Sequence, residues 1–137
     1  MKNKGFTLME LLVAVVMISI LAAIVLPTTN LTLERMKEME LKHNLMEIRT
    51  GLDAYKEGGY SKKSGENTPS GYPLNLNDLV KTHILRSIPR DPFNDTTSDD
   101  VNDMWKKVPF STSDDSWYDI RSKSTGVALD GTKFNTW

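Results

Sequence analysis

The sequence has no cysteine among its 137 residues, which excludes a disulfide framework, a thiolate metal site and a cysteine nucleophile. An excess of charge is also missing, because 17 lysine and arginine residues face 18 aspartate and glutamate residues. A chain with this balance has no general attraction to nucleic acid, and we expect no nucleic-acid partner. Neither a G-x-S-x-G motif nor a phosphate-binding loop is present, and His43 and His83 stand alone. The sequence therefore predicts a protein that is not an enzyme.

The apolar residues are concentrated at one end of the chain. Residues 6–26 form an apolar block with a single charge, and no comparable block follows. A helix of about 21 residues is about 31 Å long, close to the roughly 30 Å of a bilayer's hydrocarbon core. Backbone groups in lipid must bond internally, so we expect a membrane-spanning helix over residues 6–27. Lys2 and Lys4 precede it and predict a cytoplasmic N-terminus.

A secretory signal peptide is the alternative interpretation of this block. The apolar core of a signal peptide has roughly 7 to 15 residues and ends in an A-x-A-like cleavage site. Here the block is longer, and Ala22-Ala23-Ile24 lacks that spacing. We therefore favour a segment that stays in the protein.

The single charge in the block is Glu10. An ionised carboxylate in lipid costs at least about 2.5 kcal/mol at the helix centre, so such a residue persists where it has a partner or a function. A position near the lipid headgroups, where Glu10 stays hydrated, is the alternative. The sequence by itself does not separate these two interpretations.

The stretch Gly5-Phe6-Thr7-Leu8-Met9-Glu10-Leu11-Leu12 resembles the processing motif of type IV pilins and type II secretion pseudopilins. The resemblance implies that residues 1–5 are a leader, which a prepilin peptidase removes by cutting between Gly5 and Phe6. It further implies N-methylation of Phe6 and pairing of Glu10 with the Phe6 amine of a neighbouring subunit. Removal of one partner of a buried pair of this kind costs about 3 to 5 kcal/mol.

Pro27 falls where this family usually has a helix-disturbing proline. Proline lacks an N–H and clashes with the carbonyl group four residues earlier. The resemblance implies that the helix can unwind here inside a filament. A simple boundary between a membrane helix and a soluble helix is the alternative.

Residues 28–57 are predicted to form an amphipathic helix. Its apolar residues are spaced by 4, 3, 4 and 3 positions, which places them on one helix face: Leu41, Leu45, Ile48, Leu52 and Tyr55. Gly58-Gly59 predicts the end of the helix.

Residues 58–137 have the pattern of a small domain with several short elements. A loop is predicted over residues 58–73, and a short helix over Leu74–Leu85 with Asn75 or Asn77 as its N-cap. Residues 117–122 have strand propensity, and residues 127–134 suggest a hairpin around Asp130-Gly131. The predicted fold is α+β, the pilin fold, in which a long N-terminal helix packs on a small C-terminal antiparallel sheet.

Residues 91–119 contain eight aspartates and no glutamate. Residues 88–93, residues 118–122 and Asp130-Gly131 resemble elements of the major pseudopilins. The resemblance implies a bound calcium ion with Asp119, Ser122 and Asp130 as ligands. Calcium takes oxygen ligands, but no EF-hand loop is present. A solvated acidic loop is the alternative.

The resemblance implies a structural subunit of a periplasmic pseudopilus in a type II secretion-like system, assembled from the inner membrane of a Gram-negative bacterium to drive protein export. The implied partners are further copies of the chain, minor pseudopilins, the prepilin peptidase, an inner-membrane assembly platform with its ATPase, and membrane lipid before assembly. A type IV pilin or minor pilin of a surface filament, serving adhesion, motility or DNA uptake, is the second interpretation. A membrane-tethered periplasmic binding protein is the third.

Overall fold

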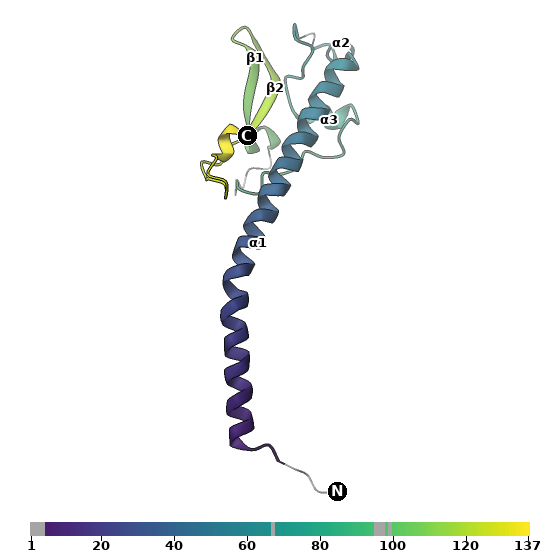
Figure 1. Cartoon of the computed structure of the whole chain (residues 1–137). Coiled ribbons are helices and arrows are strands. Elements are labelled where there is room, and N and C mark those ends of the chain that lie inside the picture. The colour runs from purple at the N-terminus through teal and green to yellow at the C-terminus, as the bar shows by residue number, and fades with distance from the viewer. Residues whose placement is uncertain (1–4, 67, 95–97, 99) are drawn as a thin grey trace. The chain divides into compact units, whose positions relative to one another are not determined.

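The computed structural model describes residues 5–66, 68–94, 98 and 100–137, with the side chains of residues 26–29 and 101 also outside the description. The chain divides into two compact units, Met1–Met36 and Lys37–Trp137, and each is described by itself. The predicted fold class is confirmed: a long N-terminal helix is followed by a small antiparallel sheet (Figure 1).

The long helix α1 (Leu8–Glu57) begins in the first unit and ends in the second. It stops at Gly58-Gly59, as the sequence predicts, because Gly59 adopts a left-handed conformation with φ of 62°. Its backbone is helical through Pro27, whose side chain lies outside the described residues. The surroundings of Pro27 therefore stay a prediction.

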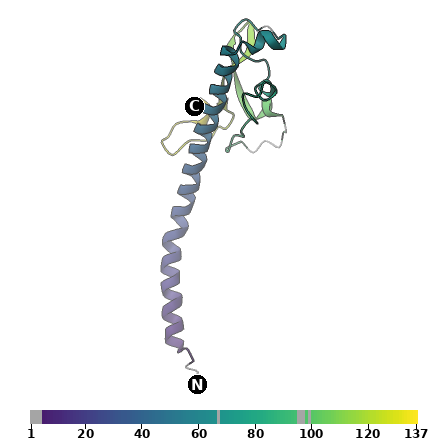
Figure 2. The ribbon, with the colours of Figure 1, turned by 90° about the vertical axis from the view of Figure 1, so that its right-hand side faces the viewer.

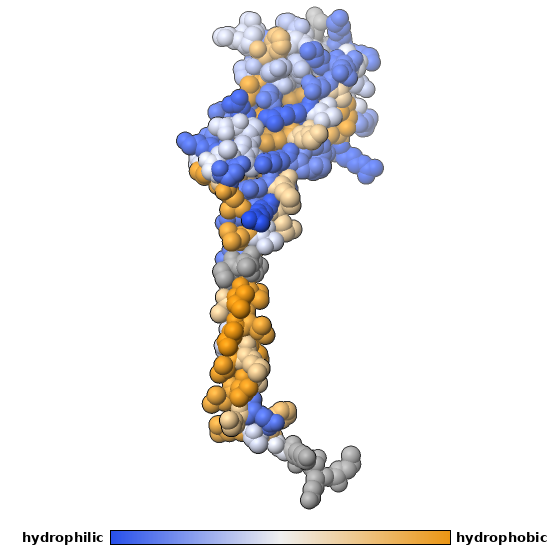
Figure 3. Space-filling view, viewed as in Figure 1, coloured by the Kyte–Doolittle hydropathy of each residue, from blue (hydrophilic) through white to orange (hydrophobic). Residues whose placement is uncertain are grey.

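In the N-terminal unit, every described side chain from Phe6 to Val25 is exposed. On the face that Figure 3 shows, this part of α1 is mostly apolar, with a hydrophilic patch near its N-terminal end. By length and composition, α1 contains a stretch that can cross a membrane. An apolar surface of this extent normally marks contact with lipid or with another protein.

The predicted apolar face of α1 forms the centre of the core of the C-terminal unit. Its five residues are each at most 2% exposed: Leu41, Leu45, Ile48, Leu52 and Tyr55. They share one cluster of buried side chains with residues of the sheet and of the short helices, among them Leu79, Trp105 and Ile120. Full burial of one such aliphatic side chain stabilises the fold by about 1.5 to 3 kcal/mol.

The sheet consists of β1 (Trp105–Ser111) and β2 (Asp114–Ser122), which pair antiparallel with Trp105 opposite Ser122 and Val108 opposite Asp119 (Figures 1 and 2). β2 extends the predicted strand, whereas β1 lies in the stretch expected to be an acidic loop. The pairing becomes irregular on either side of Pro109, which cannot donate a ladder hydrogen bond.

The predicted hairpin over residues 127–134 is reduced to one bridge, Val127 opposite Lys133. Gly131 closes the turn with φ of 85°, and its N–H donates to the carbonyl of Ala128 over 2.9 Å. The 3₁₀ helix η1 (Phe134–Thr136) follows and prevents a longer second strand.

Three short α-helices complete the C-terminal unit. α2 (Tyr60–Ser64) lies within the predicted loop, and α4 (Val101–Met104) precedes β1. α3 (Asn77–Lys81) is shorter than the predicted helix over residues 74–85. The reason is local: Asn75 Oδ1 accepts the N–H of Asn77 over 2.8 Å in a side-chain turn, and His83 after the helix has φ of 59°.

Candidate processing and assembly site

The bond between Gly5 and Phe6 lies just before α1, in a segment without helical structure. Phe6 is 86% exposed, and a Cβ atom built on Gly5 would meet no atom within 4 Å. An exposed peptide bond outside a helix is accessible to a peptidase. Residues 1–4 of the predicted leader lie outside the described residues.

Thr7 and Glu10 form a reciprocal cap on the first turn of α1. The N–H of Glu10 donates to Thr7 Oγ1 over 3.2 Å, and the N–H of Thr7 donates to Glu10 Oε2 over 3.1 Å. The Thr7 hydroxyl group also donates to Oε2 over 3.1 Å. This is a capping box, in which two backbone N–H groups without helical partners are satisfied. Sequence reasoning missed Thr7, although the T-x-x-E spacing was the signal for it.

The capping box leaves half of the Glu10 carboxylate open. Both bonds from Thr7 go to Oε2, and among the described residues no donor reaches Oε1. The negative charge lies at the N-terminal end of a helix, where the helix dipole favours it. Cleavage between Gly5 and Phe6 would keep the Thr7 amide, so the cap survives processing. The site can therefore hold Glu10 in a fixed direction and still accept a second donor.

The first predicted calcium ligand, Asp119, pairs with a cation of its own chain. Arg49 Nε donates to Asp119 Oδ1 over 2.7 Å, and Arg49 Nη2 donates to the carbonyl of Ile120 over 3.0 Å. The N–H of Ile120 donates to the same Oδ1 over 2.7 Å. Arg49 on α1 therefore supplies the positive charge that a metal ion would otherwise bring to Asp119.

The other two predicted ligands have separate partners. The buried Ser122 hydroxyl group donates to Asp91 Oδ2 over 2.5 Å. Asp130 is exposed and accepts from the Thr132 hydroxyl group over 2.6 Å and from its N–H over 2.9 Å. These bonds from Thr132 lower the pKa of Asp130 below its usual value.

In the structure, Asp119, Ser122 and Asp130 each hydrogen-bond to a different partner. In the part of the chain that the structure describes, no three histidine, aspartate or glutamate side chains come together as a metal site. Calcium therefore stays a prediction.

Comparisons with known proteins agree with the geometry at the N-terminus. Residues 1–26 match the family described as the prokaryotic N-terminal methylation motif. The type II secretion system core protein G of Pseudomonas aeruginosa is 31% identical over 99 residues, which cover 67% of this chain and 69% of that protein. No solved structure matches the chain. On the strength of this relative, the methylation motif and the α+β fold, the chain belongs to the family of type II secretion core protein G and is a type II secretion pseudopilin subunit.

Proposed function

We propose that this chain is processed between Gly5 and Phe6 and polymerises into a periplasmic filament whose growth drives protein export. Residues 6–27 would hold it in the inner membrane before assembly, with the C-terminal unit in the periplasm. Its partners would be further copies of itself, minor pseudopilins, the prepilin peptidase, and an inner-membrane assembly platform with its ATPase. In this role the chain is a structural subunit without catalysis.

The capping box beside the cleavage bond is the observation that carries this proposal. Cleavage creates an amino group on Phe6, directly before the Thr7 cap. Oε1 of Glu10 has no donor among the described residues, and the surrounding helix surface is apolar. A hydrogen bond to a charged group contributes about 1.5 to 3 kcal/mol. The Phe6 amine of a neighbouring subunit is a donor of this kind, and its charge compensates that of Glu10.

The roles of Glu10 as a cap and as a charge can be separated by substitution. Glu10→Gln keeps an oxygen that accepts from Thr7 but removes the charge, whereas Thr7→Val removes the hydroxyl group and keeps the charge. Ser19→Ala is a matched control, because Ser19 lies on the same apolar helix and, among the described residues, its hydroxyl group donates only to the Val15 carbonyl. Each variant would be expressed with its secretion system, and filaments released from lysed spheroplasts would be quantified by electron microscopy.

We expect Glu10→Gln to be processed and to stay in the membrane without filaments. Thr7→Val should form filaments in reduced amount, because loss of an N-cap costs about 1 kcal/mol. Ser19→Ala should assemble as the wild type does. Normal filaments from Glu10→Gln would refute the role of the charge.

The mature N-terminus is the second readout. Intact mass and N-terminal sequencing of the wild-type protein from membranes should give a chain that starts at Phe6 with one additional methyl group. A chain that starts at Met1 would contradict processing, and one that starts beyond Leu26 would indicate ordinary secretion.

A further inference from the structure

The C-terminal unit contains a buried carboxylate with one oxygen that lacks a partner. Asp78 on α3 is 5% exposed. Its Oδ1 accepts from Lys81 Nζ over 2.6 Å, but its Oδ2 is buried without a hydrogen-bond partner. Buried polar atoms without partners are rare in folded proteins, so this oxygen requires an explanation.

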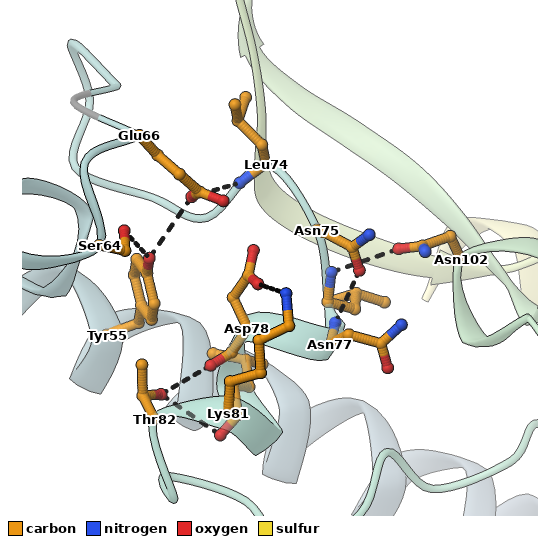
Figure 4. A network of polar contacts seen from close by, with 12 residues as sticks. Tyr55, Ser64, Glu66, Leu74, Asn75, Asn77, Asp78, Lys81, Thr82 and Asn102 are labelled. Carbon is orange, nitrogen blue, oxygen red and sulfur yellow. Dashed lines mark hydrogen bonds and ion pairs between the residues drawn. The ribbon is translucent and has the colours of Figure 1, made fainter.

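A second carboxyl group, that of Glu66, faces this oxygen. Glu66 follows α2, and its Oε2 accepts from the Tyr55 hydroxyl group and from the N–H of Leu74, both over 3.4 Å. Tyr55 is fully buried on α1, and Ser64 Oγ lies 3.2 Å from its hydroxyl oxygen. Figure 4 shows Glu66 on the side of Asp78 that is turned away from Lys81.

The charges of this cluster do not balance if both carboxyl groups are ionised. Lys81 from α3 is the only cation among the described groups that contact the pair, and it lies against Asp78 Oδ1. An ionised carboxylate can only accept hydrogen bonds, so Glu66 and Asp78 would then face each other with acceptors alone. A proton on Glu66 turns one acceptor into a donor and gives Oδ2 of Asp78 its missing partner.

We propose that Glu66 and Asp78 share one proton in the folded chain. This shared proton, which we call the latch, stabilises the contact between the two residues only while the pH is low enough to keep it bound. It would hold the described residues of the connection between α2 and α3, 65–66 and 68–76, against α1 and α3. The latch loosens as the pH rises and the proton leaves.

The pKa shifts of Glu66, Tyr55 and Lys81 agree with this proposal. Burial, followed by the close approach and the negative charge of Asp78, raises the pKa of Glu66 above its usual value. Burial is also the main reason that the pKa of Tyr55 is raised, which keeps its hydroxyl group protonated. The hydrogen bond to Asp78 raises the pKa of Lys81, which therefore stays charged.

The raised pKa of Glu66 determines how the stability of the folded chain changes with pH. A carboxyl group whose pKa is higher in the folded than in the unfolded chain binds its proton more tightly when folded. Its contribution to stability is complete below the ordinary glutamate pKa and is lost as the pH rises through the higher folded value. This is the reverse of what an ion-paired carboxylate does.

The test is thermal unfolding of the full-length chain in detergent micelles between pH 4.5 and 8, followed by tryptophan fluorescence. Glu66→Gln carries an N–H donor for Asp78 at every pH, so its midpoint should fall less than that of the wild type over this range. At pH 8 it should unfold several degrees above the wild type. Glu57→Gln is the matched control, because Glu57 is exposed at the end of α1 and should not change the wild-type slope.

A direct measurement covers the case in which Glu66→Gln does not fold. The ¹³C chemical shift of the Glu66 carboxyl carbon should titrate at a higher pH than that of Glu57. In Asp78→Asn, whose amide group can donate to Glu66, this titration should move toward that of Glu57.

Two results would overturn the proposal. One is a Glu66 carboxyl group that titrates together with or below Glu57. The other concerns calcium at pH 8: millimolar calcium would raise the melting midpoint of the wild type but not that of Glu66→Gln. The pair would then bind a cation instead of a proton.

Discussion

Arg49 connects α1 to β2 through two contacts, and its replacement by methionine is predicted to destabilise the C-terminal unit. Methionine keeps most of the apolar stem but loses the ion pair with Asp119 and the hydrogen bond to the Ile120 carbonyl. The two charged side chains are 39% and 28% exposed, so solvent screens the pair and it contributes about 1 kcal/mol. The hydrogen bond to the carbonyl adds about 1 kcal/mol. We expect a loss of about 2 kcal/mol in the free energy of unfolding.

The assay is thermal and urea unfolding of the full-length protein in detergent, followed by tryptophan fluorescence. In a unit of this size, each kcal/mol lowers the melting temperature by about 4 to 8 °C. Arg86→Met is the matched control, because Arg86 is exposed and makes no ion pair among the described residues. A melting temperature for Arg49→Met equal to that of Arg86→Met would refute the importance of both contacts.

The same variant tests calcium. An ion bound through Asp119 Oδ1 would compete with the Arg49 guanidinium group for that oxygen. If calcium binds there, Arg49→Met should bind it more tightly than the wild type, and Asp119→Asn should lose it. Melting temperatures that do not respond to calcium in the wild type or in Arg49→Met would argue against Asp119 as a ligand.

Two further predictions concern the core and acid stability. Leu52→Ala removes a fully buried side chain and should cost about 2 to 5 kcal/mol in urea unfolding. Burial opposes a low pKa for Asp114, but hydrogen bonds from Ser70 and Ser116 outweigh it and lower the pKa of Asp114. The resulting stability is present above the ordinary aspartate pKa and lost as the pH falls, so Asp114→Asn should flatten the decline of the melting temperature in acid.

The helix face of the core could be predicted because the signal is periodic and local. Leu41 to Tyr55 repeat at helical spacing, and a glycine pair ends the pattern. β1 could not be predicted in the same way, because its sequence contains two lysines and a proline within an acidic stretch. What defines β1 is tertiary: Trp105 is fully buried, its Nε1 donates to the Pro89 carbonyl over 3.0 Å, and β2 supplies the ladder.

The residues of the candidate site also differ in whether the sequence alone could predict their contacts. Gly5, Phe6 and Glu10 lie within one short motif, so the sequence brings them together without knowledge of the fold. Arg49 and Asp119 are 70 positions apart, and only the packing of β2 on α1 makes them partners. A resemblance that assigns Asp119 to calcium carries no information about Arg49, which explains why the predicted ligand has a different partner in the structure.

Glu10 differs from the paired carboxylates of the C-terminal unit because it has no cationic partner among the described residues. Asp119 has Arg49 and Asp78 has Lys81, so each charge is compensated within the chain. Glu10 has only the neutral donors of Thr7 among the described residues, and these fix its direction without cancelling its charge. Lys2 and Lys4 would be removed with the leader under the proposed processing. An oriented, uncompensated charge on an apolar helix gains most from a partner that brings a cation, and the mature N-terminus of a second copy is such a cation. This is why Glu10→Gln, which keeps the direction and removes the charge, tests assembly more sharply than Glu10→Ala, which removes both.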